Sequence, residues 1–511
     1  MLTRRGLLQG ALGASVVVAT PGWARKRPGV LRAGEFAQGV ASGIPALHGA
    51  TLWTRVDGLE RAGFVVLEVA SDRGFGNVVE RRRMRVTPGA DGTGRVHIGG
   101  LPAGSQFFYR FHTRTSESPV GRFRTKRPAD SAEPVRVAFF SCQNWQTGYF
   151  TGHAGLALED DLDLAVCVGD YIYEAASDPG PRVDKIGPDQ SAQTLEEYRE
   201  KYRMYRSDPA LQALHQAHPY AICWDDHEVE SSYYRDHGGN VQGRERRVPF
   251  LERRRNGYQA FFEHMPVIRL RGERDRIYRR IGLGAHAEVV LTDLHQYADP
   301  PPCEGAPSEG PVILVPCEEA KDPKRTLLGA TQRAWLEQTL TRPGRPAWEL
   351  WGTSMMLMAL DNAPGQPFTI GEWSGWEGER NSLAASLKAK GIKDLAAFSG
   401  DIHTFFAGQW TTDGRATGSS VGVEFVSGSM TSSGISESFG GQSTFTDQVR
   451  DINPHITYAN TARRGYAVVE ADAKELRVIF RSPESVKEKV SKVEDLAKFR
   501  VERGTNVVEQ Q

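Results

Sequence analysis

The sequence predicts an α/β protein of two domains, a small antiparallel β-sandwich followed by a larger layered α/β domain. The chain has 511 residues, which is too long for a single ordinary hydrophobic core. Residues 36–126 consist of short alternating segments separated by Gly, Pro or Asp, a pattern typical of a sandwich. Within residues 135–481 apolar runs alternate with helical stretches, and this pattern indicates a layered α/β domain.

Five short segments predict the sandwich strands: "GATLWTRV", "FVVLEVA", "GRVHIGG", "SQFFYRFHT" and "PVGRFRT". The polar, proline-bearing stretch 125–134 that follows is predicted to be a linker. At the other end of the chain, residues 482–511 are rich in charged side chains. We expect a charged C-terminal helix there, after the last strand of the α/β domain.

The first residues have the pattern of an export signal. Arg4 and Arg5 precede the apolar run 11–19, and the small residue Ala24 follows it. A charged start, a short apolar middle and a small-residue exit predict a signal peptide over residues 1–24. Adjacent arginines followed by leucines resemble a twin-arginine signal. The predicted location is therefore periplasmic or secreted, reached through the twin-arginine machinery.

Composition excludes some classes of partner. Apolar residues make up 39% and charged residues 25% of the chain, as in soluble globular proteins. Lys and Arg together number 63, as do Asp and Glu, so no net field attracts a polyanion. No nucleic-acid-binding surface is predicted. No stretch is long and apolar enough for a transmembrane segment.

The five cysteines divide by their surroundings. Cys167 and Cys223 lie in apolar strands and are predicted to be buried, unreactive thiols. Cys303 and Cys317 flank a loop rich in proline and glycine, which could close as a disulfide in an exported protein. Cys142 differs from these four because it lies between Ser141 and Gln143, just beyond the apolar run "VRVAFF".

Two patterns on predicted helices are expected to be structural. Tyr198, Tyr202 and Tyr205 share one helix face, which favours packing on the sheet over a binding role. The arginine-rich stretch 243–264 is expected to be a solvated helix face rather than a site for a polyanion.

Polar residues follow seven of the apolar strands in the α/β domain. They are "SCQ" at 141–143, "DYIY" at 170–173, "DDHE" at 225–228, "DLHQY" at 293–297, "GTS" at 352–354, "GDIH" at 400–403 and "SGS" at 427–429. In layered sheets of this kind, ligands collect beyond the carboxyl ends of the strands. Seven such endings predict a site.

The residue types at these endings favour metal binding. A single Asp–His pair two residues apart is a weak indication, because Gly-Asp is also common in turns. Three acid-bearing clusters on separate strands are a stronger one. Several carboxylates suit an oxygen-binding ion such as calcium, whereas a thiolate with a phenolate suits a transition metal such as iron. A pair of close cations would account for the density of acids.

The motifs "SCQ", "GDYIYE", "WDDHEVE", "GDIHTFFAG" and "EFVSGSMTSSG" occur in this order. Together with the export signal and the β domain, they make the chain similar to the alkaline phosphatase D (PhoD-like) family of calcineurin-like metallophosphoesterases. The resemblance covers nearly the whole chain. It implies a four-layer α/β/β/α catalytic domain, a site with Fe³⁺ and Ca²⁺, and hydrolysis of phosphate esters outside the cytoplasm.

The resemblance also implies roles for individual residues. Cys142 and Tyr173 would be thiolate and phenolate ligands of iron, and Asp170 would bridge iron and calcium. Asp401 and His403 would complete the metal cluster. The alternatives are structural roles: a buried thiol for Cys142, turn residues for Asp170 and Asp401, and a packed ring for Tyr173.

On the calcium side, Asp225 or Asp226 would be a ligand, and the sequence does not separate the two. His227 is the candidate for protonating the leaving oxygen or holding a phosphoryl oxygen, with a structural histidine as the alternative. His295 stands where the family has an arginine that clamps phosphate, so an always-charged group is replaced by one that titrates.

Other departures from the family surround the same pocket. Ser231 and Ser232 replace asparagines, of which one binds calcium in the family, and serine is a weaker calcium ligand. Thr353 and Ser354 replace an amide, and the stretch 374–380 lacks an acid. We expect the metals to be retained, with altered substrate preference or lower activity.

The predicted function is an exported metal-dependent phosphohydrolase, a phosphodiesterase or alkaline phosphatase that uses metal-activated hydroxide. The substrate would be a phosphate ester, either a small molecule or a lipid head group. Loss of the arginine favours diesters slightly, because a diester carries less charge. The alternatives are a non-catalytic exported binding protein with a degenerate metal site, and a hydrolase of another ester.

Overall fold

The computed structural model describes most of the chain. The described residues are 29–176, 180–186, 190–239, 245–270, 272–303, 317–369, 371–438 and 445–511. The predicted export signal, residues 1–24, lies outside them. Within the described ranges, every helix is too short or too polar to cross a bilayer.

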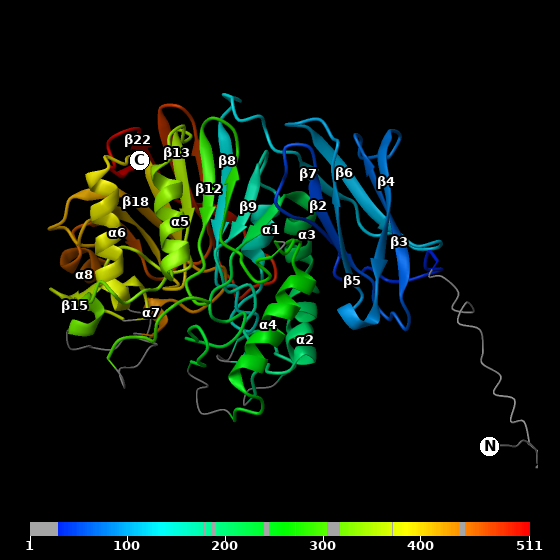
Figure 1. Ribbon diagram of the computed structural model, residues 1–511, viewed down its shortest axis with the longest axis horizontal. Helices are drawn as coiled ribbons and strands as arrows, with labels where there is room; N and C mark the ends of the chain where they lie inside the picture. Colours follow the sequence, from blue (N-terminus) through cyan, green and yellow to red (C-terminus); the bar gives the residue numbers. More distant parts are fainter. Residues whose placement is uncertain are drawn as a thin grey trace, which may run out of the picture.

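The N-terminal part is the predicted β-sandwich (Figure 1). One sheet has the order β1-β2-β5 and the other β4-β3-β6-β7. The strands are β1 (Val40–Ser42), β2 (Ala50–Arg55), β3 (Gly63–Ala70), β4 (Val78–Val86), β5 (Thr93–Ile98), β6 (Gln106–His112) and β7 (Gly121–Arg124). Alternate residues such as Phe107, Tyr109 and Phe111 are buried between the sheets, as the period of two along a strand requires.

The α/β domain contains two sheets of seven strands. The first has the order β10-β9-β8-β20-β21-β22-β23 and the second β11-β12-β13-β16-β18-β17-β19. Strands of the first sheet are β8 (Val135–Phe140), β9 (Leu164–Cys167), β10 (Tyr220–Ile222), β20 (Tyr466–Ala471), β21 (Glu475–Pro483), β22 (Val493–Glu502) and β23 (Glu509–Gln510). Strands of the second are β11 (Arg279–Gly282), β12 (Ala287–Leu291), β13 (Trp348–Gly352), β16 (Leu395–Ser399), β17 (Phe405–Thr411), β18 (Ser420–Ser427) and β19 (Ile456–Asn460). A short hairpin joins β14 (Asp361–Ala363) to β15 (Gln366–Pro367).

The two sheets pack face to face through aromatic side chains. Phe139 of the first sheet stacks on Phe398 of the second, with ring centroids 4.2 Å apart. Phe480 of the first sheet contacts Phe405 of the second at 4.8 Å. These rings belong to one continuous buried core, which is the central layer boundary expected of an α/β/β/α arrangement.

Helices cover the outer faces. The longer helices are α1 (Thr151–Ala157), α2 (Leu195–Arg206), α3 (Pro209–Ala217), α4 (Phe250–His264), α5 (Ala330–Thr341), α6 (Glu377–Ala389) and α8 (Phe445–Ile452); α7 (Ile435–Ser438) is a single turn. Helix α1 packs on β21 and β22, and α6 packs on β18 of the other sheet. The structure thus confirms the predicted fold class, a sandwich followed by a layered α/β domain (Figure 1).

Helix α2 begins with a capping box, in which Thr194 and Glu197 satisfy each other's backbone N–H groups. Tyr198, Tyr202 and Tyr205 are fully buried on its inner face, so the prediction of a packing role is confirmed.

The sandwich is attached to the α/β domain through buried contacts. The Trp53 indole N–H donates to the Glu263 carbonyl at 2.8 Å, and the guanidinium of Arg206 lies 4.0 Å from the Trp53 ring centre. Arg122 donates to the Ala217 carbonyl at 2.9 Å. These contacts hold the sandwich against α3 and the end of α4, away from the strand ends described below.

The prediction of a C-terminal helix is wrong. Residues 482–511 continue β21 and then form β22 and β23 at one edge of the first sheet. In β22 the side chains of Ala497, Phe499 and Val501 are buried, and those between them face outward. This period of two is the strand pattern; the many charged residues on the outer face concealed it.

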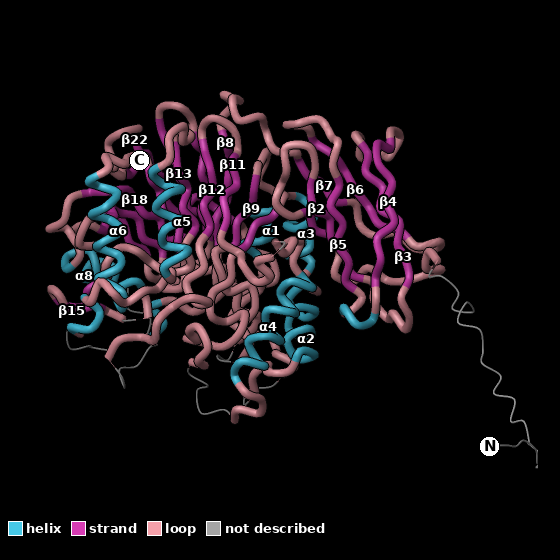
Figure 2. The backbone as a smooth tube through the Cα atoms, viewed as in Figure 1, coloured by secondary structure: helices cyan, strands magenta, loops and turns pink. Residues whose placement is uncertain are grey.

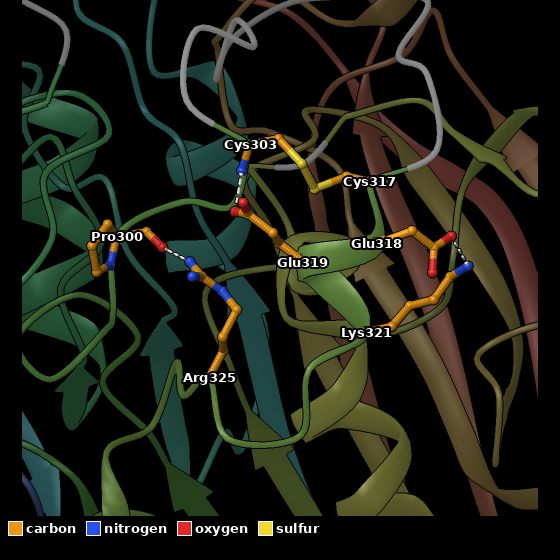
Figure 3. The surroundings of a disulfide bond; sticks show 7 residues. All are labelled: Pro300, Cys303, Cys317, Glu318, Glu319, Lys321 and Arg325. Carbon is orange, nitrogen blue, oxygen red and sulfur yellow. Dashed lines mark hydrogen bonds and ion pairs between the residues drawn. A yellow bond between two sulfur atoms is a disulfide. The ribbon is translucent and has the colours of Figure 1, made fainter.

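Cys303 and Cys317 form a disulfide (Figure 3), as the sequence allowed. Beside it, the backbone N–H of Cys303 donates to Glu319 at 2.9 Å, and Arg325 donates to the Pro300 carbonyl. These contacts link residues 300–303 to residues 317–325.

We predict that Phe499→Ala lowers the free energy of unfolding by about 3–5 kcal/mol, because it empties a fully buried aromatic site. Phe499 contacts Phe480 at 5.0 Å and Tyr458 at 5.2 Å. The neighbouring change Lys498→Ala, on the outward face of the same strand, should cost less than about 0.5 kcal/mol. Urea denaturation measures the free energy of unfolding of both variants. Equally small effects would contradict the assignment of these residues to a strand with one buried face.

Candidate metal centre

The carboxyl ends of the parallel strands from both sheets meet at one rim. Strands β8, β9 and β10 run parallel in the first sheet, and β12, β13, β16 and β18 do so in the second. Loops gather below the sheets at this rim (Figure 2). They surround a cavity of about 700 Å³. The predicted site residues that line it are Tyr173, Asp226, His227, His295, Asp401 and His403.

One group of ligand atoms at this rim mixes sulfur, oxygen and nitrogen. Ligand atoms of Cys142, Asp170 and His403 all lie within 4.8 Å of one another. The Tyr173 hydroxyl donates to Asp170 at 2.9 Å and lies 3.1 Å from His403 Nε2. His403 Nδ1 lies 2.8 Å from the Ser433 carbonyl. Because a carbonyl only accepts, Nδ1 carries the proton, and the Nε2 lone pair is left for a metal.

A second group is built from carboxylates. Oxygens of Asp170, Asp225 and Asp401 lie within 4.8 Å of one another, and those of Asp225 and Asp226 lie within the same distance of His295. Asp170 belongs to both the mixed group and this one. Asp225 and Asp226 both belong to this group, so both remain candidate calcium ligands.

The backbone is strained where these ligands are placed. Cys142, Asp170, Asp401 and His403 have φ values of 56°, 56°, 60° and 53°. Residues with a side chain rarely adopt this left-handed region. Such strain is kept where the surrounding structure over-determines it, often at functional sites. Here it turns four predicted ligands toward one another directly after β8, β9 and β16.

The crowding of buried carboxylates in this cluster favours the binding of cations. Burial raises the pKa of Asp170 well above its usual range. Burial, reinforced by Asp225 and Asp226, raises the pKa of Asp401 to about 8. One buried oxygen of Asp170 and one of Asp226 have no hydrogen-bond partner among the described residues. Buried carboxylate oxygens of this kind are costly unless paired or bound to a metal, so the residues fit a pair of cations.

His227 is held in place by Glu174. Its Nδ1 lies 2.7 Å from a Glu174 oxygen, and its ring packs on that of Tyr173 with centroids 4.1 Å apart. Burial alone would lower the pKa of His227, but Asp226, Glu174 and Asp170 outweigh it and raise the pKa. These acids thus favour the protonated form of the imidazole.

Arg253 is a further member of this network that the sequence did not indicate. It lies in the arginine-rich stretch expected to be solvated, yet it is fully buried on α4. It pairs with Glu230 and lies 3.9 Å from Glu174. For Arg253 the expectation of a solvated face is wrong, because two buried acids require a buried cation.

His295 lies in the centre with both ring nitrogens engaged. Nε2 lies 2.7 Å from Asp225 and Nδ1 lies 2.8 Å from the Tyr233 carbonyl. Burial lowers the pKa of His295, but the bond to Asp225 outweighs this and raises it to about 9. The ring thus holds Asp225 instead of presenting a free nitrogen to the cavity.

Besides Glu174, two further acids of the centre were not predicted. Glu228 accepts the backbone N–H groups of Tyr171 and Asp225 at 2.6 and 2.8 Å and so holds two of the strand-end turns. Glu228 lies within the motif "WDDHEVE", but its position there did not indicate that it would accept these backbone N–H groups. Glu372 lines the cavity, and burial, reinforced by the charge of Asp401, raises the pKa of its carboxyl well above the usual range. It comes from a loop without any strand-end pattern, so the sequence offered no means of finding it.

Ser231 and Ser232, expected from the resemblance to replace asparagines, lie beside this network. Ser231 donates its backbone N–H to Glu174 at 2.9 Å, and its buried hydroxyl has no partner in the described part of the chain. Ser232 lines the cavity and donates its backbone N–H to Asp226. Thr353 and Ser354 are likewise buried, with hydroxyls that lack a described partner.

Comparison with known proteins agrees with this geometry. The family model described as PhoD-like phosphatase matches residues 137–480, and the model described as PhoD-like phosphatase, N-terminal domain, matches residues 22–127. Alkaline phosphatase D of Bacillus subtilis (strain 168) is 33% identical over 455 residues, which cover 84% of this chain and 74% of that protein.

Solved structures show the same relationship. The structure of PhoD superposes with a TM-score of 0.82 at 29% identity, over 93% of this chain and 92% of that chain. Purple acid phosphatase PPD1 from seeds of yellow lupin (Lupinus luteus) shares the fold, with a TM-score of 0.56 at 12% identity over 91% of this chain and 74% of that chain. With two family models, a relative and a structure in agreement, the chain belongs to the PhoD-like phosphatase family and is a metal-dependent phosphoesterase.

Proposed function

We propose that this chain is an exported phosphohydrolase that binds iron and calcium in residues 135–481 and cleaves phosphodiesters or phosphomonoesters. The observation that carries this proposal is the pair of adjoining ligand groups of different chemistry that share Asp170. Nothing in the comparisons favours a non-catalytic binding protein or a hydrolase of another ester.

The ligand types suggest which ion each group would hold. Cys142, Tyr173 and His403 offer sulfur, phenolic oxygen and nitrogen, which suit iron. Asp225, Asp226 and Asp401 would offer the oxygens that calcium prefers, with Asp170 shared between the two ions. When bound, such a pair of cations activates water and neutralises charge on the phosphoryl oxygens.

The remaining polar residues would act on the substrate or position the ligands. His227 is the candidate for holding a phosphoryl oxygen or protonating the leaving oxygen, since its Nδ1 is bound to Glu174 and Nε2 is left for the substrate. Glu174, anchored by Arg253, would orient that ring. His295 would act as a positioning residue for Asp225 rather than as the phosphate clamp that the sequence suggested.

Export would depend on residues 1–24. The twin arginines Arg4 and Arg5 support this assignment, and the disulfide between Cys303 and Cys317 suits an oxidising compartment. The twin-arginine route carries folded proteins, so metals could be loaded before export.

We predict that Asp170→Asn removes both metals and lowers phosphatase activity by about a thousandfold or more, because several kcal/mol of charge stabilisation are lost. The matched control is Asp160→Asn, an exposed aspartate before β9, which should keep metals and activity. Metal analysis and hydrolysis of bis(4-nitrophenyl) phosphate measure both. Full activity in Asp170→Asn would refute the proposal.

The two ligand groups are separable by mutation. Tyr173→Phe should lower bound iron by roughly tenfold and leave calcium nearly unchanged, whereas Asp226→Asn should do the reverse. Metal content of each purified variant, with circular dichroism as a check of folding, measures this. Loss of the same ion in both variants would contradict the assignment of ions to groups.

Replacement of Arg4 and Arg5 by lysine should stop export and leave the folded, active chain in the cytoplasm, because the twin-arginine pair is what the pathway recognises. Cell fractionation followed by a phosphatase assay measures the distribution. A chain carrying Arg25→Lys is the control, and unchanged export of the double variant would exclude this route.

A further inference from the structure

The charge of the sandwich differs from that of the whole chain. Residues 29–127 contain 15 Arg and Lys but only 8 Asp and Glu, a surplus of seven positive charges, whereas the chain as a whole has 63 of each kind. The neutrality of the whole chain therefore conceals a basic domain. Such a surplus indicates an interaction with anions when the charges share one face.

Part of this surplus lies on the outward face of the sheet β4-β3-β6-β7. On β4, Met84 and Val86 are buried in the sandwich core. The period of two along a strand therefore places Arg81, Arg83 and Arg85 on the opposite, outward face. All three arginines are exposed.

Arg110 of β6 belongs to the same face. Arg81 and Arg110 both bind the carboxylate of Glu68, which lies between them on β3, at 2.9 and 2.8 Å. Two strand spacings, about 10 Å, separate β4 from β6. We call the four residues Arg81, Arg83, Arg85 and Arg110 the basic face. Its positive charge covers an area of the sheet rather than a single line.

Acidic side chains compensate only part of this charge. Glu68 is buried and is shared by two arginines, and Glu117 pairs with Arg110 at 3.2 Å. The ion pairs found on β4 within the described ranges leave Arg83 and Arg85 without an acidic partner. These two residues therefore present uncompensated charge to the solvent.

The uncompensated arginines carry an electrostatic cost. Alternate residues of a strand are about 7 Å apart, which is less than the Debye length of about 8 Å at physiological salt, so their charges repel one another. Charges on an edge strand such as β4 also oppose pairing with another chain. Protection of the edge does not require a further cation on the inner strand β6, whereas a bound anionic surface uses both.

Apolar side chains lie among these charges. Val79 on β4, two residues before Arg81, is 42% exposed. Phe75, in the hairpin between β3 and β4, has the guanidinium of Arg110 4.2 Å from its ring centre. Arginines interleaved with apolar groups match the interface of a bilayer, where charged head groups meet acyl chains. A soluble polyanion offers the charge without the apolar layer, so the face fits a lipid surface better.

The basic face lies apart from the metal centre. Strands β3 and β4 are on the side of the sandwich away from the α/β domain (Figure 1). The sandwich meets that domain through Trp53 of β2 and Arg122 of β7 instead. A surface bound to the basic face therefore leaves the cavity at the strand ends open.

We propose that the basic face binds the surface of a bilayer that contains anionic lipids and so holds the protein at that surface. Arg83 and Arg85 face the lipid phosphates, and Val79 and Phe75 contact the layer below the head groups. The binding is peripheral and reversible, because a few cations with little apolar area give weak attachment. It does not depend on the reaction at the metal centre.

Sedimentation with lipid vesicles tests this. The metal-loaded, full-length chain is mixed with vesicles of phosphatidylcholine, either alone or with about a third of phosphatidylglycerol, at low and at high salt. We expect at least about tenfold tighter binding to the anionic vesicles, and loss of this advantage at high salt. A chain that begins at Arg25 keeps every described residue and is measured in parallel, so that lipid binding by residues 1–24 is measured separately.

The double variant Arg83→Gln with Arg85→Gln should lower the partition coefficient on anionic vesicles by roughly tenfold or more, since each arginine near such a surface contributes about fivefold. The matched control is Arg255→Gln with Arg274→Gln. These are exposed arginines of the α/β domain that make no ion pair with a described residue, so the net charge changes equally and binding should persist. Both double variants should hydrolyse bis(4-nitrophenyl) phosphate in solution at the wild-type rate.

Three results would overturn the inference. They are equal binding to neutral and anionic vesicles, equal loss of binding in the two double variants, and binding that disappears in the chain beginning at Arg25. A chain that binds soluble polyphosphate but not the anionic vesicles would also overturn it and would identify a linear polyanion as the partner. None of these results bears on the proposed function, which the Asp170→Asn variant tests.

Discussion

Four aspartates, a thiol and a phenol share one enclosed rim, and this density of acidic groups is stable only with positive charge bound among them. Moving a carboxylate out of water costs several kcal/mol, and each like-charged neighbour adds to the cost. The raised pKa values of Asp170 and Asp401 express this cost in the absence of cations. The left-handed backbone at Cys142 and His403 adds strain. A bound pair of cations offsets both the electrostatic cost and the backbone strain. The other features of the site follow from this need for positive charge.

The paired sheets make this arrangement possible. Parallel strands of both sheets end at the same rim, and the stacked rings of Phe139 and Phe398 fix the sheets against each other directly behind it. Helix α4 then reaches the site from outside through Arg253, which links the helix to Glu174 and so to His227. The position of a side chain at the metal centre is thus set by the core and not by the loops alone.

Most of the candidate metal centre could be predicted because its proposed ligands follow strands within short motifs. Cys142, Asp170 and His403 each come within a few residues of a buried apolar run, so the sequence itself indicates their edge of the sheet. Glu372 and Arg253 could not be predicted, because they reach the centre through tertiary packing. For His295 the location at a strand end could be predicted but not the orientation of the ring, since its partner Asp225 lies 70 residues away in the chain.

The prediction of a helix for residues 482–511 was wrong for a different reason. Charged side chains on the outer face of β22 resemble those of a solvated helix, and only the pairing with β21 fixes the period of two. Its buried face completes the core that supports the first sheet.

A crystal structure of the natively expressed protein, with anomalous diffraction data at the iron edge, would test for the proposed two-ion site. The proposed two-ion site predicts an iron peak within bonding distance of Cys142, Tyr173 and His403, and a second cation bound by Asp225, Asp226 or Asp401. A fully ordered site with these side chains bonded only to one another and to water would contradict it.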